Sequence, residues 1–512
     1  MLGERDVVAE VTLSSAPVRI EDVVAVASGA HVAVSAETTA LLGRSRAVVE
    51  TALASGKPVY GLNTRLGAGR DTVLTPTEII QFQRRVIANH EGGIGQALPA
   101  IEARALTFAR LAGFSRGGSG VRPQLAEAYA ALLNAGVTPV VPSRGSVGAG
   151  DLTHLAAVAA VVIGTGQAAS SDGQSVVPGA SALADAGLEP FELAAGEGLA
   201  SISSNAYSVG VGALTVRYLE RLADAADRAV GLSLEALGQN GSGGNLSPFD
   251  PAIQAATGRA EQAAVAASIL QLLDGSALTA GSGRRVSVQD PLSFRTVPQL
   301  HGAVRGRIRS ARVELEIELN ARSENPLVDV DSGQMLSGGN FEIVALALEF
   351  EALRLAVAQL AAASERRIAL LSELSVPLRA AGTAKIPGLL WYSAAANLAE
   401  IRQLAQPVST SVTTLSGVED QATQAPLALQ LLQRSVVLTE EILAIEALHA
   451  TQLLDLDAGV GTDAGVGADA GADAGLGVGT EPLARSIQAV LGAGVPASAL
   501  VTVVTAILGN SS

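Results

Sequence analysis

The segment from Pro142 to Ala156 brings together residue types that can bind an anion or a polar substrate. Gly145, Gly148 and Gly150 permit tight backbone turns in the first half of the segment. A glycine-rich loop that leads into a helix leaves backbone N–H groups pointing at whatever lies at the helix N-terminus. The pattern therefore indicates either a binding loop or an ordinary turn capped by Asp151.

The composition favours helices as the elements that position this loop. The chain has 512 residues, of which 48% are hydrophobic and only 3% aromatic. Such a core is built more easily from packed helices than from strands, and its size indicates more than one domain. The absence of cysteine excludes disulfides and zinc–thiolate sites, and we assign no metal ligands. A net charge of −15 without a basic cluster argues against nucleic acid and anionic membrane surfaces as partners.

Apolar residues recur at helical spacing over long stretches, which predicts a bundle of long helices. The patterns cover residues 206–237, 256–273, 296–322, 343–373, 390–405 and 425–453. Before them, loosely alternating residues up to about 30 predict short edge strands, and Ser35 is a suitable N-cap for a following helix. We expect a mainly α protein. Its parts are an N-terminal mixed domain with the functional loops (1–205), a central long-helix bundle (206–454), an acidic loop (455–480) and a C-terminal helical segment (481–512).

The acidic loop repeats Asp-Ala-Gly four times and contains no lysine or arginine. Low complexity and like charge predict a flexible excursion, and the irregular carboxylate spacing disfavours a calcium-binding repeat. The first twelve residues are charged and carry no apolar stretch, and the longest apolar run, 155–163, is too short to span a bilayer. We therefore expect a cytoplasmic protein without a membrane segment.

Motifs spread along the chain resemble, in order, those of the aromatic amino acid ammonia-lyases, which include histidine, phenylalanine and tyrosine ammonia-lyases and related aminomutases. The resemblance covers about residues 20–455. It implies the helical fold shared with fumarase and aspartase, an amino-acid-like substrate, and a homotetramer whose subunits share active sites. The motifs lie at residues 60–64, 83–95, 118–122, 138–149, 289–302, 318–327, 337–341, 365–367 and 400.

The prosthetic-group loop departs from the pattern that it resembles. The family cyclises an internal Ala-Ser-Gly tripeptide to form methylidene-imidazolone, whereas this chain reads Gly148-Ala149-Gly150-Asp151 and lacks the serine. Ser146 is nearby, but the amide that would have to attack belongs to β-branched Val147. We therefore expect no methylidene-imidazolone and no other cofactor, unless Ser146 cyclises. Three family residues, a tyrosine, an asparagine and a glutamine, are replaced by Leu292, Ser203 and Val418.

The resemblance nominates the site residues, and their chemistry suggests their roles. Tyr60 is the candidate general base, although an ordinary tyrosine pKa near ~10 means that it needs positive charge or donors nearby to ionise. His90 is a candidate proton shuttle, and Arg295 can hold a carboxylate by two parallel N–H bonds. For each, a purely structural role is the alternative. The further catalytic candidates are Ser146 and His154. The further binding candidates are Asn63, Arg65, Ser203, Asn205, Gln289, Leu292, Asn325, Phe341 and Glu400.

Two residues are unusual for the family. Arg65 stands where the family commonly has glycine, so we expect it either to lower the pKa of Tyr60 and offer a second anion site or to face solvent. His154 stands where the family often has proline. A position near a helix N-terminus disfavours the charged ring, so His154 is either a neutral proton acceptor or a partly buried helix residue.

We expect an enzyme of this family that performs elimination, addition, isomerisation or cyclisation on an amino-acid-like anionic substrate in specialised metabolism. Without an electrophile, the substrate must supply an acidified C–H bond or a leaving group better than an amine. Two alternatives stay open. One is an inactive homologue that serves as a structural or regulatory partner, and the other is an ordinary ammonia-lyase with a cyclised Ser146.

Overall fold

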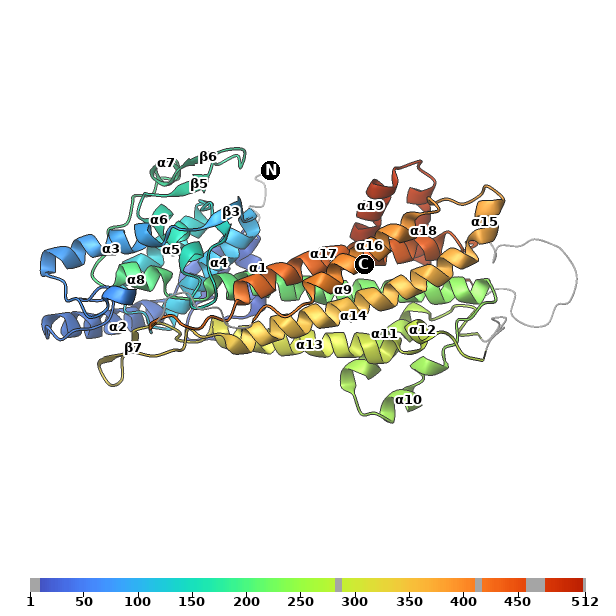
Figure 1. Ribbon diagram of the computed structural model, residues 1–512, viewed down its shortest axis with the longest axis horizontal. Coiled ribbons are helices and arrows are strands. Elements are labelled where there is room, and N and C mark those ends of the chain that lie inside the picture. Colours follow the sequence, from blue (N-terminus) through green and yellow to red (C-terminus); the bar gives the residue numbers. More distant parts are fainter. Residues whose placement is uncertain (1–9, 281–287, 410–416, 457–474, 510–512) are drawn as a thin grey trace, which may run out of the picture. The chain divides into compact units, whose positions relative to one another are not determined.

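The structure is a computed structural model that describes residues 10–280, 288–409, 417–456 and 475–509 (Figure 1). The chain forms two compact units. The first comprises residues 1–217, 311–350 and 407–430, and the second comprises residues 218–310, 351–406 and 431–512. Each unit is assembled from three segments that are separated in the sequence. The predicted domains, with boundaries at residues 205, 454 and 480, are continuous segments instead, and these boundaries stay a prediction. Most of the acidic loop, 457–474, lies outside the described residues.

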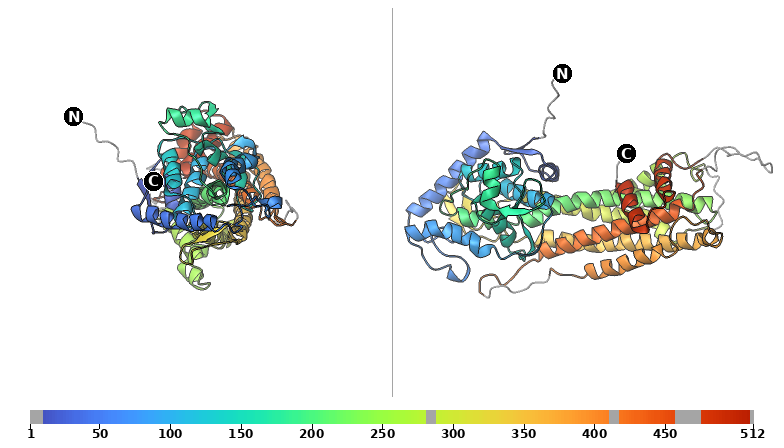
Figure 2. Two further views of the ribbon diagram at one scale, coloured as in Figure 1. Left: turned by 90° about the vertical axis from the view of Figure 1, so that its left-hand side faces the viewer. Right: turned by 90° about the horizontal axis from the view of Figure 1, so that it is seen from above.

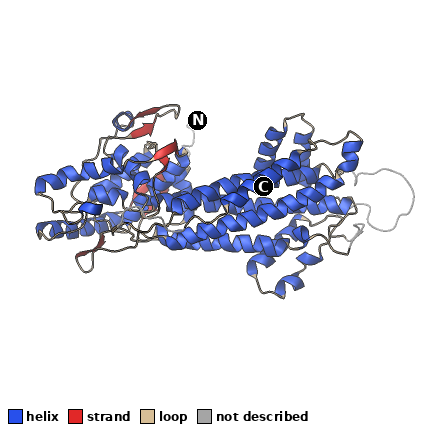
Figure 3. Ribbon diagram, in the orientation of Figure 1, coloured by secondary structure: helices blue, strands red, loops and turns tan. Residues whose placement is uncertain are grey.

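Helices dominate both units, as the composition predicts (Figure 3). Four long helices contribute residues to both units: α9 (Ala206–Gln239), α13 (Val297–Leu319), α14 (Val344–Leu374) and α17 (Ala425–Thr451). The helical periodicity of the sequence located all four within a few residues. Among the residues that the structure describes, none of the helices has the length and apolar character needed to cross a membrane.

The first unit combines shorter helices with two-stranded sheets. Strands β1 and β2 pair in parallel, and β3–β4, β5–β6 and β7–β8 pair antiparallel. The helices of this unit are α1 (Ile20–Ala27), α2 (Ala36–Ala54), η1 (Gly67–Gly69), α3 (Pro76–His90), α4 (Ala100–Ser115), α5 (Pro123–Asn134), α6 (Leu152–Val162), α7 (Gly179–Asp185) and α8 (Glu197–Ile202). The strands are β1 (Glu10–Leu13), β2 (His31–Val34), β3 (Ile94–Ala97), β4 (Pro142–Arg144), β5 (Gln167–Ala169), β6 (Val176–Pro178), β7 (Leu327–Asp329) and β8 (Gln334–Leu336).

Local capping explains why the helix start predicted after Ser35 is correct, and a second cap of the same kind starts α3. The Ser35 hydroxyl accepts a hydrogen bond from the Thr38 N–H at 3.1 Å at the start of α2. A capping box between Thr75 and Glu78 starts α3. The prediction of strands alone up to residue 30 was wrong, because α1 forms between β1 and β2. Its β-branched residues suit a strand, but burial of one helical face against α4 outweighs this preference.

The second unit is a bundle of long helices with short helices around it (Figure 2). The buried Glu446 of α17 joins three of the long helices. Its carboxylate binds Arg367 of α14 at 2.6 and 2.8 Å and accepts hydrogen bonds from Ser364 of α14 at 2.5 Å and Ser233 of α9 at 2.8 Å. A buried charge pair needs such additional donors to offset its desolvation. The remaining helices are η2 (Ser247–Phe249), α10 (Pro251–Ala255), α11 (Ala260–Leu272), α12 (Leu292–Arg295), α15 (Val376–Ala380), α16 (Leu390–Leu404), α18 (Glu481–Leu491) and α19 (Ala497–Gly509).

Candidate active site

A cavity of about 590 Å³ opens within the first unit, where loops and helix ends from separate parts of the chain meet. This volume suits a small organic molecule of amino-acid size. The cavity brings together six of the predicted site residues, namely Tyr60, Arg65, His90, Ser203, Asn325 and Phe341. The backbone of the glycine loop, at Ala149 and Gly150, also lines it.

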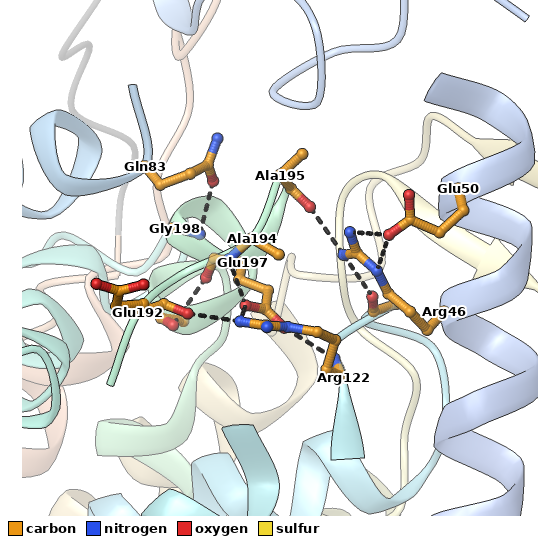
Figure 4. Close-up of polar contacts among 11 residues, drawn as sticks. Arg46, Glu50, Gln83, Arg122, Glu192, Ala194, Ala195, Glu197 and Gly198 are labelled. Carbon is orange, nitrogen blue, oxygen red and sulfur yellow. Dashed lines mark hydrogen bonds and ion pairs between the residues drawn. The ribbon is translucent and has the colours of Figure 1, made fainter. Parts of the chain in front are cut away.

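Helix α8 ends at this cavity and is held in place by a buried carboxylate (Figure 4). Glu197 is fully buried and accepts hydrogen bonds from the Arg122 guanidinium at 2.8 and 3.0 Å. It also accepts from the backbone N–H groups of Arg122 at 2.9 Å and Ala194 at 2.7 Å. Charge-assisted bonds of this kind are among the stronger polar contacts in proteins. They fix the helix that carries Ser203, its C-cap, to the cavity wall.

A second contact joins α8 to α3, the helix that ends at His90. Gln83 Oε1 accepts a hydrogen bond from the Gly198 N–H at 2.9 Å (Figure 4). A Cβ atom at Gly198 would lie 2.6 Å from the Gln83 carbonyl oxygen, so only glycine allows this approach. The two helices that supply Ser203 and His90 are therefore locked together.

Tyr60 lines the cavity and is protonated at neutral pH. Its hydroxyl oxygen accepts a hydrogen bond from the Gly67 N–H at 3.3 Å. Burial raises the pKa of Tyr60 above its usual value, the Gly67 bond and the charge of Arg70 lower it, and the charge of Glu419 raises it further. The cation acting on Tyr60 is thus Arg70, rather than Arg65 as the sequence suggested.

Arg65 and Arg70 belong to one closed loop, which begins three residues after Tyr60. The Leu74 N–H donates to the Asn63 carbonyl at 2.9 Å, and the Arg65 N–H donates to the Thr72 carbonyl at 3.0 Å. These bonds close residues 63–74 at their base, and the short helix η1 forms the tip. A loop that is closed in this way holds its side chains in fixed positions at the cavity.

His90 sits at the last turn of α3 with a defined tautomer. Its Nδ1 lies 2.7 Å from the Val86 carbonyl oxygen, which can only accept, so Nδ1 carries a proton. In the neutral ring, Nε2 then holds the lone pair. This arrangement suits a group that exchanges protons with a ligand in the cavity, because His90 is part of its lining.

The glycine loop is held from the opposite side by residues 423–425. The Gln424 N–H donates to the Val147 carbonyl at 2.8 Å, and the Thr423 hydroxyl donates to the Gly148 carbonyl at 3.0 Å. Gly148 has a φ of +86°, and a Cβ atom there would lie 2.1 Å from Thr423 Oγ1. Glycine is therefore required at this position by both backbone conformation and space.

Asp151 is fully buried and caps helix α9 instead of α6. Its Oδ2 accepts a hydrogen bond from the Ser208 N–H at 2.8 Å, and no capping bond runs from its side chain to α6. Burial raises the pKa of Asp151 to about 7, although hydrogen bonds from Ser208 and Tyr207 oppose the shift. The prediction that Asp151 caps the turn at the start of the following helix was therefore wrong. Its carboxyl group instead binds the loop to the first turn of α9.

Ser146 and His154 form a pair outside the cavity lining. His154 Nε2 lies 3.2 Å from the Ser143 carbonyl and must donate to it, so Nδ1, 2.8 Å away, accepts from the Ser146 hydroxyl. Burial lowers the pKa of His154 to about 4, and its ring stacks on Tyr207 at 4.1 Å between centroids. The ring is therefore neutral at physiological pH. Ser146 thus belongs to the loop and His154 to the first turn of α6, and their contacts hold the loop backbone at Ser143 and Ser146.

Of the three predicted asparagines, Asn63 and Asn205 bind the backbone, and Asn325 lines the cavity. Asn63 is buried, accepts from the Val59 N–H at 2.7 Å and donates to the Lys57 carbonyl at 2.8 Å, so it shapes the turn before the cavity. Asn205 donates to the carbonyl of Phe341 at 2.7 Å and is not part of the lining. Asn325 does line the cavity, and its Oδ1 accepts from the Gly338 N–H at 3.1 Å.

The other four predicted residues belong to the second unit. The Arg295 guanidinium donates to the side-chain oxygen of Gln289, and Leu292 at the start of the same short helix is exposed. Glu400 forms an ion pair with Arg434 at 2.7 Å, and this partner lowers the pKa of Glu400. None of the four lines the cavity of the first unit within one chain.

Comparison with known proteins shows which family has this fold and this order of motifs. The family model described as aromatic amino acid lyase matches residues 18–470. The chain belongs to the aromatic amino acid lyase family. It is 39% identical to the histidine ammonia-lyase of Anaeromyxobacter sp. (strain K) over 456 residues, which cover 86% of this chain and 89% of the relative. The helical ammonia-lyase fold predicted from the sequence is confirmed.

Solved structures of the family cover almost the whole chain. Ergothionase from Treponema denticola, an ergothioneine-degrading enzyme, superimposes with a TM-score of 0.87 at 27% identity over 98% of both chains. Histidine ammonia-lyase from Trypanosoma cruzi gives a TM-score of 0.82 at 27% identity over 98% of this chain and 93% of the other. Tyrosine aminomutase from Streptomyces globisporus gives 0.85 at 28% identity over 98% and 97%.

Membership of the family corrects the expectation that no cofactor is present. Histidine ammonia-lyases and aminomutases depend on methylidene-imidazolone, so the aromatic amino acid lyase family normally carries this group. The prediction that the cofactor is absent, which was based on the sequence of one loop, was wrong as a statement about members of this family. The group is the default for a member of this family.

The loop residues of this chain nevertheless do not fit the group at its usual place. No serine stands between Ala149 and Gly150, and glycine and alanine have no hydroxyl to lose. The serine that precedes this pair, Ser146, has its hydroxyl engaged with His154 at 2.8 Å and Thr153 at 2.9 Å. The chemistry of the cavity is therefore assigned to side chains that the chain has.

Sequence reasoning missed two charged residues of the cavity, Arg70 and Glu419. Arg70 lies five residues after Arg65 across a Gly-Ala-Gly tip, a spacing that brings the two arms of a short loop together. That spacing was the available signal. Glu419 directly follows Val418, which the resemblance already placed at a family site position, and that neighbour was the available signal.

Proposed function

We propose that this member of the aromatic amino acid lyase family is a carbon–nitrogen lyase that eliminates an amine from an amino-acid-like anionic substrate. The observation that carries the proposal is the cavity in which Tyr60, His90, Asn325 and Phe341 surround a space of about 590 Å³ beside the glycine loop. Family membership is shown, whereas the substrate and the place of the reaction in specialised metabolism are part of the proposal.

In the proposed reaction, the phenolate of Tyr60 removes a proton from the carbon next to the one that bears the amine. The electron pair of that C–H bond becomes the second bond of a carbon–carbon double bond, and the C–N bond of the substrate's ammonium group breaks so that a neutral amine leaves with the bonding pair. Burial keeps Tyr60 protonated at rest, and the Gly67 N–H and the charge of Arg70 oppose this effect and stabilise the phenolate when it forms. His90, with its lone pair on Nε2, is placed to exchange a proton with the departing group.

Arg295 is proposed to hold the substrate carboxylate from a neighbouring subunit, with Gln289 and Glu400 beside the substrate. The support is that these residues belong to the second unit and do not line the cavity of their own first unit. Exposed apolar side chains on α13 and α14, such as Val313, Ile317 and Leu348, are compatible with burial between subunits. A homotetramer in the cytoplasm remains our prediction.

Two substrates are favoured by the relatives. Histidine follows from the histidine ammonia-lyases, and ergothioneine follows from the ergothioneine-degrading ergothionase. Turnover of either forms a conjugated unsaturated acid, which is followed by its ultraviolet absorption. Turnover of neither, together with no turnover of phenylalanine or tyrosine, would favour the inactive structural or regulatory homologue.

The first test is Tyr60→Phe assayed on the substrate that the wild type turns over. We expect kcat to fall by about 10² to 10⁴, the usual contribution of a positioned acid or base. Tyr392→Phe is the matched control, because Tyr392 is exposed on α16 and outside the cavity. Equal kcat in the two variants would remove Tyr60 from the role of base.

A second measurement concerns the prosthetic group. Cyclisation with dehydration lowers the intact mass by two water molecules and adds a near-ultraviolet absorption band, and a Ser146→Ala variant shows whether Ser146 is the source. A lowered mass that Ser146→Ala restores would support the ordinary ammonia-lyase mechanism with a group formed at Ser146. The proposed role of Tyr60 is tested separately, since it does not depend on this result.

A further inference from the structure

We propose that Arg65 and Arg70 together bind a second anionic group of the substrate, such as a side-chain carboxylate or sulfonate. This inference rests on the proposed function, in which Arg295 holds the first carboxylate. It points beyond histidine and ergothioneine, which each carry a single carboxylate, to amino-acid-like compounds with two anionic groups.

Both arginines are exposed and line the cavity, and the charge of Arg65 also acts on the nearby carboxylate of Glu78. In the described ranges, neither guanidinium forms a hydrogen bond or an ion pair with a carboxylate. Two other arginines of the first unit are paired with buried carboxylates: Arg110 binds Glu324 at 3.3 Å and Arg122 binds Glu197 at 2.8 Å. Guanidinium groups recognise carboxylates and related anions by two parallel N–H bonds, so two uncommitted ones at a cavity wall suit an anionic ligand.

The loop geometry directs these side chains to a common place. Residues 63–74 are closed by backbone hydrogen bonds, so Arg65 and Arg70 stand on opposite arms of one small loop. The aliphatic part of Arg65 lies over Gly69, where an added Cβ would be 3.2 Å from Arg65 Cβ and 3.5 Å from its Cδ. This packing limits the positions that the Arg65 side chain can adopt, which lowers the entropy lost on binding.

The charges around the cavity leave room for an additional anion. Besides the two arginines, the titratable groups that line it are Tyr60, His90 and Glu419. Tyr60 is neutral because its pKa is raised, and Glu419 supplies one negative charge. The lining therefore contains two positive guanidinium groups and one negative carboxylate. A ligand whose negative group lies near Arg65 and Arg70 would neutralise the excess positive charge.

The test compares two ligands that differ only in one charge. The probes are the dianion 4-carboxycinnamate and its monoanionic analogue 4-carbamoylcinnamate, titrated calorimetrically into the full-length protein. We expect the wild type to bind the dianion at least about tenfold more tightly. Arg65→Gln and Arg70→Gln should each remove most of this difference, while Arg44→Gln should keep it. Arg44 is exposed on α2 and lies outside the cavity.

The monoanionic probe also reports folding. Unchanged affinity for 4-carbamoylcinnamate in Arg65→Gln and Arg70→Gln shows that the cavity is intact. Equal affinity of the wild type for both probes would overturn the inference, and so would a preference that both variants retain. Because binding is measured without turnover, a protein that discriminates the probes but eliminates no amine would contradict the proposed function and leave the anion site standing.

Discussion

At the scale of single residues, neighbours decide which predicted groups can act. Tyr60 is held next to a donor and a cation, whereas His154 is held in a buried stack that keeps its ring neutral. From residue type and position alone, Tyr60 and His154 were both predicted to transfer protons. Only the surroundings distinguish a tyrosine at the cavity from a histidine that supports a loop.

Asp151 gives a pH-dependent prediction at this scale. Its pKa is about 7 in the folded protein against 3.8 as the reference for an exposed aspartate. A raised acid pKa means that the folded state holds the proton more tightly, so the stabilisation is complete below 3.8 and is lost as the pH rises to about 7. We expect Asp151→Asn to remove this loss, because asparagine stays neutral and keeps an acceptor for the Ser208 N–H.

The measurement is the melting temperature of the wild type and of Asp151→Asn between about pH 4 and about pH 8. The difference between the two proteins should change in favour of the variant as the pH rises. Asp185→Asn, at an exposed position on α7, is the control. Curves for Asp151→Asn and wild type that remain parallel over the whole range would refute this account.

At the scale of elements, the glycine loop and residues 423–425 form one packed contact. Gly148 has a left-handed backbone, and an added methyl group would lie 2.1 Å from Thr423 Oγ1 and 3.1 Å from the Ala425 nitrogen. Two hydrogen bonds join the same segments. The position of the loop at the cavity therefore depends on a segment almost 280 residues later in the chain, because Thr423 donates to the carbonyl of Gly148 across a separation of 275 residues.

We expect Gly148→Ala to destabilise the protein by more than ~2 kcal/mol beyond a matched glycine control. The control is Gly173→Ala, because Gly173 has a φ of +69° but open space around it. That variant should lose only the ~1 to 2 kcal/mol cost of a left-handed alanine. The free energy of unfolding is measured by chemical denaturation. Similar losses in both variants would show that the contact with Thr423 is easily relieved.

Elements were predicted best where their signals are local. Ser35 and Thr75 cap helices with their own first turns, and the long periodic stretches need no information from elsewhere. Helix α1 was missed because its burial against α4 is a property of the fold. For the same reason, the motifs located Tyr60 and His90 at the cavity, while Arg70 was found only in the structure. The assigned roles of the site residues stay predictions.

At the scale of the whole molecule, the predicted site is incomplete in either unit. Tyr60 lies in the first unit and Arg295 in the second. If subunits share active sites, the two residues of one site come from different chains. The mass in solution should then be about four times the 51.5 kDa of one chain, as measured by light scattering.

Mixing two inactive variants tests the sharing directly. We expect Tyr60→Phe and Arg295→Gln each to lose most activity when expressed alone. When the two are co-expressed, random assembly restores an intact pair in about a quarter of the sites. Activity that stays at the level of the separate variants, despite mixed oligomers, would show that Tyr60 and Arg295 act within one chain or not together.

The closed loop of residues 63–74 has an evolutionary consequence. Its ends are anchored by backbone hydrogen bonds at Asn63–Leu74 and Arg65–Thr72, and these bonds do not depend on side-chain identity. The side chains at positions 65 and 70 are thus free to vary while the anchors and Tyr60 stay in place. With the proposed anion site at Arg65 and Arg70, substitutions at these two positions change substrate preference without disturbing the loop backbone. Transfer of residues 63–74 into a relative is therefore a route to altered substrate selectivity.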